Sequence, residues 1–404
     1  MSQASTWYPP PDASRAARSV TEAFHREHGH APAGVWAAPG RVNVIGEHVD
    51  YNQGLCLPFA LEHRTFVAVR PRDDDRVSVW SAQEPLTWEG PLGEVAPGTV
   101  PGWAGYAVGV PWALRAAGHV VPGLDIVVDG QVPRGSGLSS SAALECAVAV
   151  ALDELAGLGL ASDDAGRARL AAACVRAEND VAGAPTGGMD QAAALRAHAG
   201  HALLLDCRDF SVRQEPLDLA AHGLALLVID TRARHALVDG QYGSRRAVCE
   251  QAARLLSRES LRDVEPAELE DAVGSLPHDE MRRLVRHVVT EIDRVRTAAA
   301  VLDTGRMRDL GPLLDASHRS LREDFRVSCE ELDLACEAAA EAGALGARMT
   351  GGGFGGSAIA LVERGAEQAV ADAVTAAFDR AGYRAPAFLP AHPSGPAARV
   401  TAAT

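Results

Sequence analysis

The sequence predicts an α+β protein of two lobes with a cleft between them. Its 404 residues fit two domains of ordinary size. Strand patterns dominate the first half, whereas helical periodicity occupies most of Gln241–Gly343. This segregation of strands from helices differs from the regular alternation that builds a βαβ protein. We place the lobes at residues 1–215 and 216–404, with the boundary inside Cys207–His222.

Short runs rich in Val, Leu and Ile predict the strands, and apolar residues recurring every three or four positions predict the helices. The predicted strands are Phe66–Arg70, Val77–Trp80, Leu124–Val128, Ala202–Leu205, Leu224–Ile229 and Ser357–Val362. The predicted helices are Ala165–Val181, Arg245–Leu256, Met281–Leu302 and Glu330–Ala342. The first dozen residues and the Pro/Ala-rich segment Ala385–Thr404 are expected to form a loose arm and a peripheral tail.

The charge composition excludes several classes of function. Asp and Glu number 53 against 38 Lys and Arg, a formal net charge of -15, so no overall positive field would attract nucleic acid or an anionic membrane. The sequence contains no lysine, which excludes mechanisms that need the lysine of a P-loop, of a protein-kinase strand or of a Schiff base. Phosphate chemistry would therefore depend on arginine, a metal ion and backbone amides.

The cysteine pattern and the apolar runs point to the cytoplasm. The seven cysteines are scattered and include no C-x-x-C pair, which is typical of a reduced intracellular protein. The N-terminus has neither a basic start nor an apolar run, so we expect no signal peptide. No stretch approaches 18 uninterrupted apolar residues, and we expect a soluble cytoplasmic protein.

The segment Ala38–Asn52 gathers an arginine, two carboxylates and a histidine among small turn-forming residues. Arg41, Glu47, His48 and Asp50 alternate hydrogen-bond donors and acceptors that suit the hydroxyls of a sugar. A solvated polar loop is an equally simple interpretation. A metal site of Glu, His and Asp is a weaker alternative, because the spacing matches no metal motif.

A Gly/Ser loop in Pro133–Leu152 leads directly into an apolar, hence buried, helix. The loop amides and the helix N-terminus offer free N–H groups and a partial positive charge, which together form an anion site. The sequence has no Gly-Lys-Ser/Thr and is not a Walker motif. The alternative is that the serines only cap the helix, but one cap suffices and three serines behind Gly-x-Gly favour phosphate.

Two acids flank a Gly-Gly pair in Ala177–Gln191. Taken alone, Glu178 and Asp190 are more simply explained as surface charges or helix caps. An Asp beside an arginine would instead stay ionised, because the opposite charge lowers its pKa, and it could then accept a proton from a hydroxyl.

Five glycines occupy six consecutive positions in Gly351–Gly356. The spacing formally matches a dinucleotide fingerprint, but we expect a helix before it and a strand after it, which is the wrong context for a Rossmann site. So many glycines indicate close backbone approach, either to a ligand or to the Gly/Ser loop.

These four segments, in this order, resemble the galactokinases of the GHMP small-molecule kinase superfamily. Arg41–Asn52 (RVNVIGEHVDYN) resembles the sugar-binding signature, Gly135–Ala143 (GSGLSSSAA) the nucleotide loop, and Arg348–Ser357 the third superfamily motif. Supporting matches are Gly188–Gln191, Gly240–Arg246, Arg286–Glu291 and Asp324–Ser328. The resemblance implies an N-terminal lobe like the second domain of ribosomal protein S5 and a GHMP C-terminal lobe, with the active site in the cleft between them.

The resemblance also implies a role for each matched position. Asp190 would take the proton of the sugar's anomeric hydroxyl, and Arg41 would stabilise the transferring phosphoryl group. Galactose would be bound by Glu47, His48, Asp50, Gly187 and Tyr242. The triphosphate of ATP would be bound by Gly135, Ser136, Gly137, Leu138, Ser139, Ser140 and Ser141. Mg²⁺ would be held by Ser141 and Glu178, and the adenosine by Trp103 and Ser81.

The implied reaction converts galactose and ATP into galactose 1-phosphate, the entry step of galactose catabolism by the Leloir pathway. The expected protein is a monomer that needs no protein partner. The chain departs from the usual pattern at Val49, Thr186 and Gly188, and Gly188 is expected to loosen the backbone beside Asp190. Two alternatives stay open, namely a kinase for another sugar such as N-acetylgalactosamine and a catalytically silent sensor of galactose and ATP.

Overall fold

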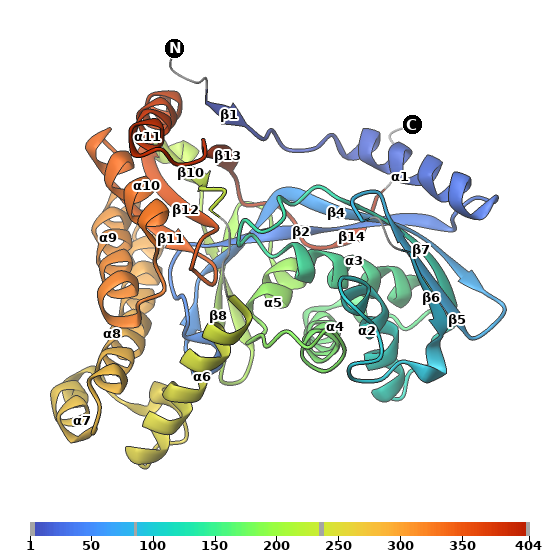
Figure 1. Ribbon diagram of the computed structural model, residues 1–404, viewed down its shortest axis with the longest axis horizontal. Coiled ribbons are helices and arrows are strands. Elements are labelled where there is room, and N and C mark those ends of the chain that lie inside the picture. The colour runs from blue at the N-terminus through green and yellow to red at the C-terminus, as the bar shows by residue number, and fades with distance from the viewer. Residues whose placement is uncertain (1–4, 85–86, 234–237, 401–404) are drawn as a thin grey trace.

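Two mixed sheets and their helices form the two halves of the molecule (Figure 1). The structure is a computed structural model that describes residues 5–84, 87–233 and 238–400, without the side chains of residues 238–242. The α+β class predicted from the sequence is confirmed. Among the described residues, no helix combines the length and the apolar character needed to cross a membrane.

The first half is built on a six-stranded sheet whose two faces are both buried. Its strands, in spatial order, are β14 (Ala398–Arg399), β2 (Gly34–Asn43), β4 (Pro58–Arg72), β7 (Gly123–Gly130), β5 (Arg76–Ser81) and β6 (Trp88–Pro91). Side chains alternate along each strand. Val35, Ala37, Phe66 and Ala68 therefore pack with α1 (Ala13–His28), whereas Trp36, Ala38, Val67 and Val69 pack with the opposite helical layer. That layer contains α2 (Ala104–Ala116), α3 (Ser140–Leu155) and α4 (Asp164–Arg176).

The second half is built on a five-stranded sheet. Its strands, in spatial order, are β1 (Thr6–Trp7), β13 (Ala387–Ala391), β10 (Leu224–Asp230), β12 (Ser357–Glu363) and β11 (Gly346–Thr350). Its helices are α6 (Val238–Leu255), α7 (Leu269–Ser275), α8 (Asp279–Asp303), α9 (Leu310–Ser320), α10 (Glu330–Glu341) and α11 (Glu367–Ala381). A small third sheet of β3 (Leu55–Cys56), β8 (His201–Asp206) and β9 (Ser211–Pro216) contacts α8 and α5 (Met189–Arg196).

All six predicted strands and all four predicted helices are present. Two of them begin earlier than predicted, β4 at Pro58 and not Phe66, and α6 at Val238 and not Arg245. The expected peripheral tail is wrong for Ala387–Ala391, because β13 is an interior strand whose residues Ala387, Phe388 and Leu389 are fully buried. The expected loose arm is wrong for β1, which pairs with β13. The strands near the two chain ends thus belong to different sheets, β1 to that of the second half and β14 to that of the first. The boundary between the predicted lobes, residues 1–215 and 216–404, stays a prediction.

Candidate active site

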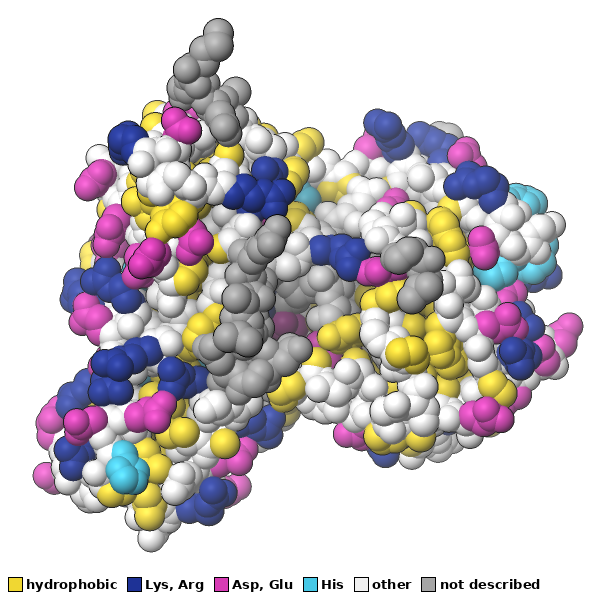
Figure 2. Space-filling model, viewed as in Figure 1, with side chains coloured by type: hydrophobic (Ala, Val, Ile, Leu, Met, Phe, Trp, Pro, Cys, Tyr) yellow, Lys and Arg dark blue, Asp and Glu magenta, His cyan; other side chains and the backbone are white. Residues whose placement is uncertain are grey.

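Two adjoining cavities lie between the halves, and Figure 2 shows the molecule hollowed there. The larger, of about 510 Å³, is lined by the Gly/Ser loop and by Ser81, Trp103 and Tyr106. The smaller, of about 130 Å³, is lined by the Glu47–Asp50 segment, Glu178 and Thr186. We call them the loop cavity and the hydroxyl cavity. Both are lined by Arg41, Asp190 and Gly352, so a group in one can meet a group in the other at these residues.

Arg41 and Asp190 form an ion pair at this junction. Arg41 lies in β2, and its Nε donates to Asp190 Oδ1 at 2.8 Å while its Nη1 donates to the Gly137 carbonyl at 2.5 Å. Ser139 Oγ donates to the other oxygen of Asp190 at 2.5 Å. Asp190 is the second residue of α5, where the helix dipole stabilises a carboxylate. The Asp190 side chain is still 22% exposed, and its oxygens have lone pairs left for a substrate hydroxyl.

The Gly/Ser loop presents the N-terminus of α3 to the loop cavity. Ser139, the residue before α3, adopts the left-handed conformation (φ 61°) and makes no side-chain cap. Ser139 therefore does not cap the helix, contrary to the alternative interpretation of the serines. The first amides of α3 can instead bind an anion. Ser136 alone among the predicted loop residues does not line the cavity, because it is buried and its hydroxyl donates to the Pro133 carbonyl at 2.6 Å.

The glycine run connects β11 to β12 as the loop of an antiparallel pair. The expected helix directly before it is wrong, since β11 intervenes after α10, but the rejection of a Rossmann site stands because no helix follows. A Cβ at Gly351 would come within 2.7 Å of the Gly137 carbonyl, so the two loops touch through their backbones as expected. Gly352 then borders both cavities.

Glu47 holds the glycine run against the first half of the chain. Its Oε1 accepts hydrogen bonds from Gly351 N at 2.8 Å and Thr350 Oγ1 at 3.0 Å, and lies 3.3 Å from Nη2 of the fully buried Arg348. Glu47 is only 2% exposed. It still lines the hydroxyl cavity, so the same carboxylate both fixes this loop and borders the cavity. Arg348 and Thr350 were not predicted as site residues, although both belong to the third motif.

His48 and Asp50 are two polar groups of the hydroxyl cavity whose pKa values are shifted. Burial and the nearby His287 lower the pKa of His48 to about 3, so its ring is neutral, with Nε2–H donating to the Gly352 carbonyl at 3.2 Å. Burial and the charge of Asp190 raise the pKa of Asp50 to about 6. A Cβ at Gly187 would collide with the Asp50 carboxylate, which explains why glycine occupies that position.

Glu178 lies in a π-helix, Ala177–Ala182, a departure from α-helix that is frequent at functional sites. Burial and the charge of Asp190 raise the pKa of Glu178 to about 7, while a hydrogen bond with Ser141 opposes this rise. Gln191 Nε2 donates both to Glu178 Oε2 at 2.5 Å and to Glu145 Oε2 at 2.9 Å. Glu145 is fully buried, and burial raises its pKa well above the ordinary value. Glu145 was not predicted as a site residue.

The remaining predicted residues are placed as follows. Ser81 and Trp103 line the loop cavity, and Thr186 lines the hydroxyl cavity. Gly188 adopts a φ of 94° immediately before α5, a conformation that favours glycine, so it fits the start of this helix rather than loosening it. Tyr242 belongs to α6, but its side chain lies outside the described residues.

The fold and the two cavities define a small-molecule kinase of the GHMP class. Residues 105–198 match the family model described as GHMP kinases N terminal domain, and residues 298–380 match GHMP kinases C terminal. The structure of Methanococcus jannaschii mevalonate kinase shares this fold, with a TM-score of 0.58 at 14% identity over 91% of this chain and 98% of that one. Kinases of this class use ATP as co-substrate.

The more specific comparisons concern one family. Residues 22–71 match the galactokinase galactose-binding signature. The chain is 51% identical to Streptomyces coelicolor galactokinase over 95% of this chain and 98% of that protein, and 44% identical to human galactokinase over 88% and 90%. A crystal structure of Lactococcus lactis galactokinase complexed with galactose matches with a TM-score of 0.88 and 31% identity over 95% and 99%. The chain belongs to the galactokinase family, which confirms the resemblance found in the sequence.

Proposed function

We propose that the protein transfers the γ-phosphoryl group of ATP to the anomeric hydroxyl of galactose, which yields α-D-galactose 1-phosphate for galactose catabolism. The observation that carries this proposal is the Arg41–Asp190 pair at the junction of the two cavities. ATP would occupy the loop cavity with its phosphates on the α3 amides, and galactose the hydroxyl cavity between His48, Asp50 and Glu47. The family membership supports both substrates.

The proposed reaction needs one proton acceptor and a positive environment for the phosphoryl group. Asp190 accepts the proton as the anomeric oxygen forms its bond to the γ-phosphorus, and the bond from that phosphorus to the bridging oxygen of ADP breaks. Arg41 both orients Asp190 and places positive charge at the junction. Burial lowers the pKa of Arg41, but the charges of Asp190 and Glu47 outweigh this and raise the pKa, so the guanidinium stays charged.

Mg²⁺ fits the residues beside the loop cavity. Ser141 and Glu178, which lie within hydrogen-bond reach of each other, would contribute hard oxygen ligands. Mg²⁺ typically takes one or two such groups together with substrate phosphates. The described residues contain no cluster of three or more His, Cys, Asp or Glu suited to a metal, which agrees with a site that the nucleotide completes. Bound there, Mg²⁺ would neutralise phosphate charge.

A panel of acceptors tests the proposed function. With Mg²⁺ and ATP, we expect ADP release with galactose and little with glucose, N-acetylgalactosamine or mevalonate. The hydroxyl cavity, of about 130 Å³, disfavours an acetamido group, which is larger than the hydroxyl it replaces. Preference for another sugar would contradict galactose as the substrate, and binding of ATP and galactose without turnover would support a silent sensor.

Galactose affinity is expected to fall at acidic pH. The pKa of Asp50 is about 6, so the carboxylate is ionised at pH 7 and mostly protonated at pH 5. If galactose hydroxyls donate to the ionised form, Kd rises about tenfold over this range. His48, whose pKa is about 3, stays neutral throughout and adds nothing. Calorimetry without nucleotide measures the change, and Asp50→Asn should bind weakly at both pH values. A constant Kd for the unmodified protein would refute this role of Asp50.

Gln191→Met is expected to raise the Mg²⁺ concentration that gives half-maximal activity by roughly tenfold or more. Methionine has a similar shape but donates no hydrogen bond, so Glu178 and Glu145 lose the amide that lies between them. The galactose KM should stay unchanged because Gln191 does not line the hydroxyl cavity. Gln214→Met, which removes a partly buried glutamine of β9 outside both cavities, is the matched control. An unaltered Mg²⁺ requirement would show that Gln191 does not position Glu178.

We further infer a monomeric cytoplasmic enzyme that needs no protein partner. The inference is supported by the acidic composition and by seven cysteines that form no disulfide. Light scattering of the purified chain tests the monomer, for which the expected mass is 42.3 kDa.

A further inference from the structure

A third cavity, of about 640 Å³, borders the other side of the Gly/Ser loop. We call it the arginine cavity, and its polar lining is Tyr8, His63, Gln131, Arg134, Asp230, Arg232 and Arg384. Pro133 and Gly135 of the loop also line it. It shares Gly130, Val132, Arg134 and Gly135 with the loop cavity and no residue with the hydroxyl cavity, so the proposed reaction does not use it.

The charge of this cavity contrasts with that of the chain. The whole protein carries a formal charge of -15, yet three arginines and one aspartate line the cavity. Arg134 already pairs with Glu84. The Arg232 guanidinium donates to the Tyr8 hydroxyl at 2.6 Å and to the Ala385 carbonyl at 3.5 Å, neither of which is charged. Arg384 is exposed and has no hydrogen bond or ion pair in the part of the chain that the structure describes.

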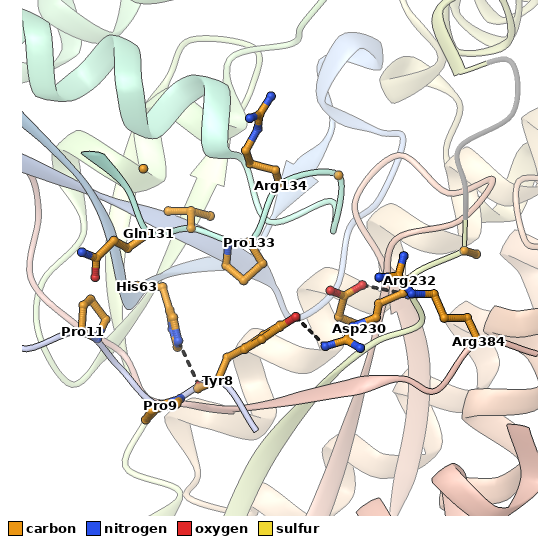
Figure 3. Close-up of a pocket in the computed structure, with 14 residues that line it drawn as sticks. Tyr8, Pro9, Pro11, His63, Gln131, Pro133, Arg134, Asp230, Arg232 and Arg384 are labelled. Atoms are coloured by element: carbon orange, nitrogen blue, oxygen red, sulfur yellow. Dashed lines mark hydrogen bonds between the residues drawn. The ribbon is translucent and has the colours of Figure 1, made fainter. Parts of the chain in front are cut away.

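Figure 3 shows Arg232 and Arg384 beside Asp230 on one side of the cavity, with Arg134 apart from them. Asp230 Oδ1 accepts the backbone N–H of Arg232 at 2.9 Å. Two guanidinium groups therefore face one carboxylate, and most of their N–H donors have no hydrogen-bond partner among the described residues. On the opposite wall, His63 is 2% exposed, and its Nε2 lies 3.1 Å from the Tyr8 carbonyl. Its Nδ1 is buried and has no hydrogen-bond partner in the described part of the chain.

We propose that the arginine cavity binds a phosphate dianion between Arg232 and Arg384, either free as inorganic phosphate or carried by a small phosphomonoester. Guanidinium groups bind phosphate through paired, charge-assisted hydrogen bonds, which are stronger than neutral ones. Two guanidinium groups and one carboxylate also leave one excess positive charge, which favours an anion at this place. A ligand hydroxyl on a phosphomonoester would supply the donor that buried His63 Nδ1 lacks.

Calorimetry with the active site already filled tests this site. The full chain is saturated with Mg²⁺, galactose and the non-hydrolysable analogue AMP-PNP, then titrated with inorganic phosphate or with galactose 1-phosphate. Binding of the two active-site ligands is measured first in the same instrument, so a failure of the proposed function is seen separately. We expect saturable binding that Arg384→Gln and Arg232→Gln each weaken by roughly tenfold or more.

Arg254→Gln is the matched control, because it removes the same charge from an exposed arginine of α6 outside the cavity. The Arg384→Gln variant should fold normally, since this exposed side chain has no partner to lose within residues 5–84, 87–233 and 238–400. Tighter binding of galactose 1-phosphate than of phosphate would support a phosphomonoester as the ligand, and equal binding would support free phosphate. Absence of binding, binding that AMP-PNP abolishes, or binding indifferent to Arg232 and Arg384 would overturn the proposal.

Discussion

Asp190→Asn is expected to lower kcat by about 10²- to 10⁴-fold while the Kd values for galactose and for AMP-PNP stay close to those of the unmodified protein. Asparagine keeps the size of the side chain but cannot accept a proton from the sugar. Its amide also presents a donor where Arg41 Nε and Ser139 Oγ now both donate, so the group would no longer be oriented as Asp190 is. The loss should therefore appear in turnover and not in binding.

Single-turnover kinetics together with calorimetry separate these two effects. Asp206→Asn is the matched control, since Asp206 is a partly buried aspartate of β8 that pairs with Arg262 and lines neither active-site cavity. A kcat of Asp190→Asn within a few-fold of that of the unmodified protein would contradict the assignment of Asp190 as the proton acceptor. A comparable loss in Asp206→Asn would show that the effect is not specific to the site.

Arg41→Lys should cost on the order of 10³-fold in kcat, even though the positive charge is kept. The Arg41 fork bonds Asp190 through Nε and the Gly137 carbonyl through Nη1, and one ammonium group cannot reproduce that planar geometry. Arg41 is 5% exposed, so water cannot replace the lost bonds easily. Removing the charge as well, in Arg41→Met, should reduce kcat further.

Arg64→Lys is the comparison for a general effect of replacing a partly buried guanidinium by an ammonium group. Arg64 lies in β4 and donates to the Pro396 and Gly395 carbonyls, away from the active-site cavities. Rapid-quench measurement of ADP formation with both substrates saturating gives kcat for each variant. If Arg41→Lys retained more than a tenth of the original kcat, the planar fork would not be what positions Asp190.

The regular elements could be predicted where local patterning and burial agree. Leu224–Ile229 and Ser357–Val362 are continuous apolar runs and became neighbouring buried strands β10 and β12. The sequence could not place β13, because its Pro-containing stretch joins the sheet only through partners more than 150 residues away in the chain. β2 was missed as a strand for a similar reason. Pro39 and Gly40 interrupt its pattern, and the register shifts between Pro39 and Arg41.

The position of residues at the two cavities could be predicted where one motif holds them together, as for Arg41, Asp190 and the Gly/Ser loop. Residues that act through long-range contacts could not. Glu145 looks like one charge in an apolar helix, and only the fold brings it to Gln191. Likewise Ser136 looked equivalent to its neighbouring serines, but its side chain turns into the loop, and its carbonyl accepts from Ser357 at 2.7 Å.

The central claim is that the junction of the two cavities delivers a phosphoryl group to the anomeric hydroxyl of galactose. Phosphorus NMR of a mixture of the protein, Mg²⁺, ATP and galactose tests it most directly. The result we predict is one new phosphate ester, coupled to the anomeric proton of the α form and formed in equal amount with ADP. An ester at another hydroxyl, or ADP with free phosphate and no ester, would contradict it.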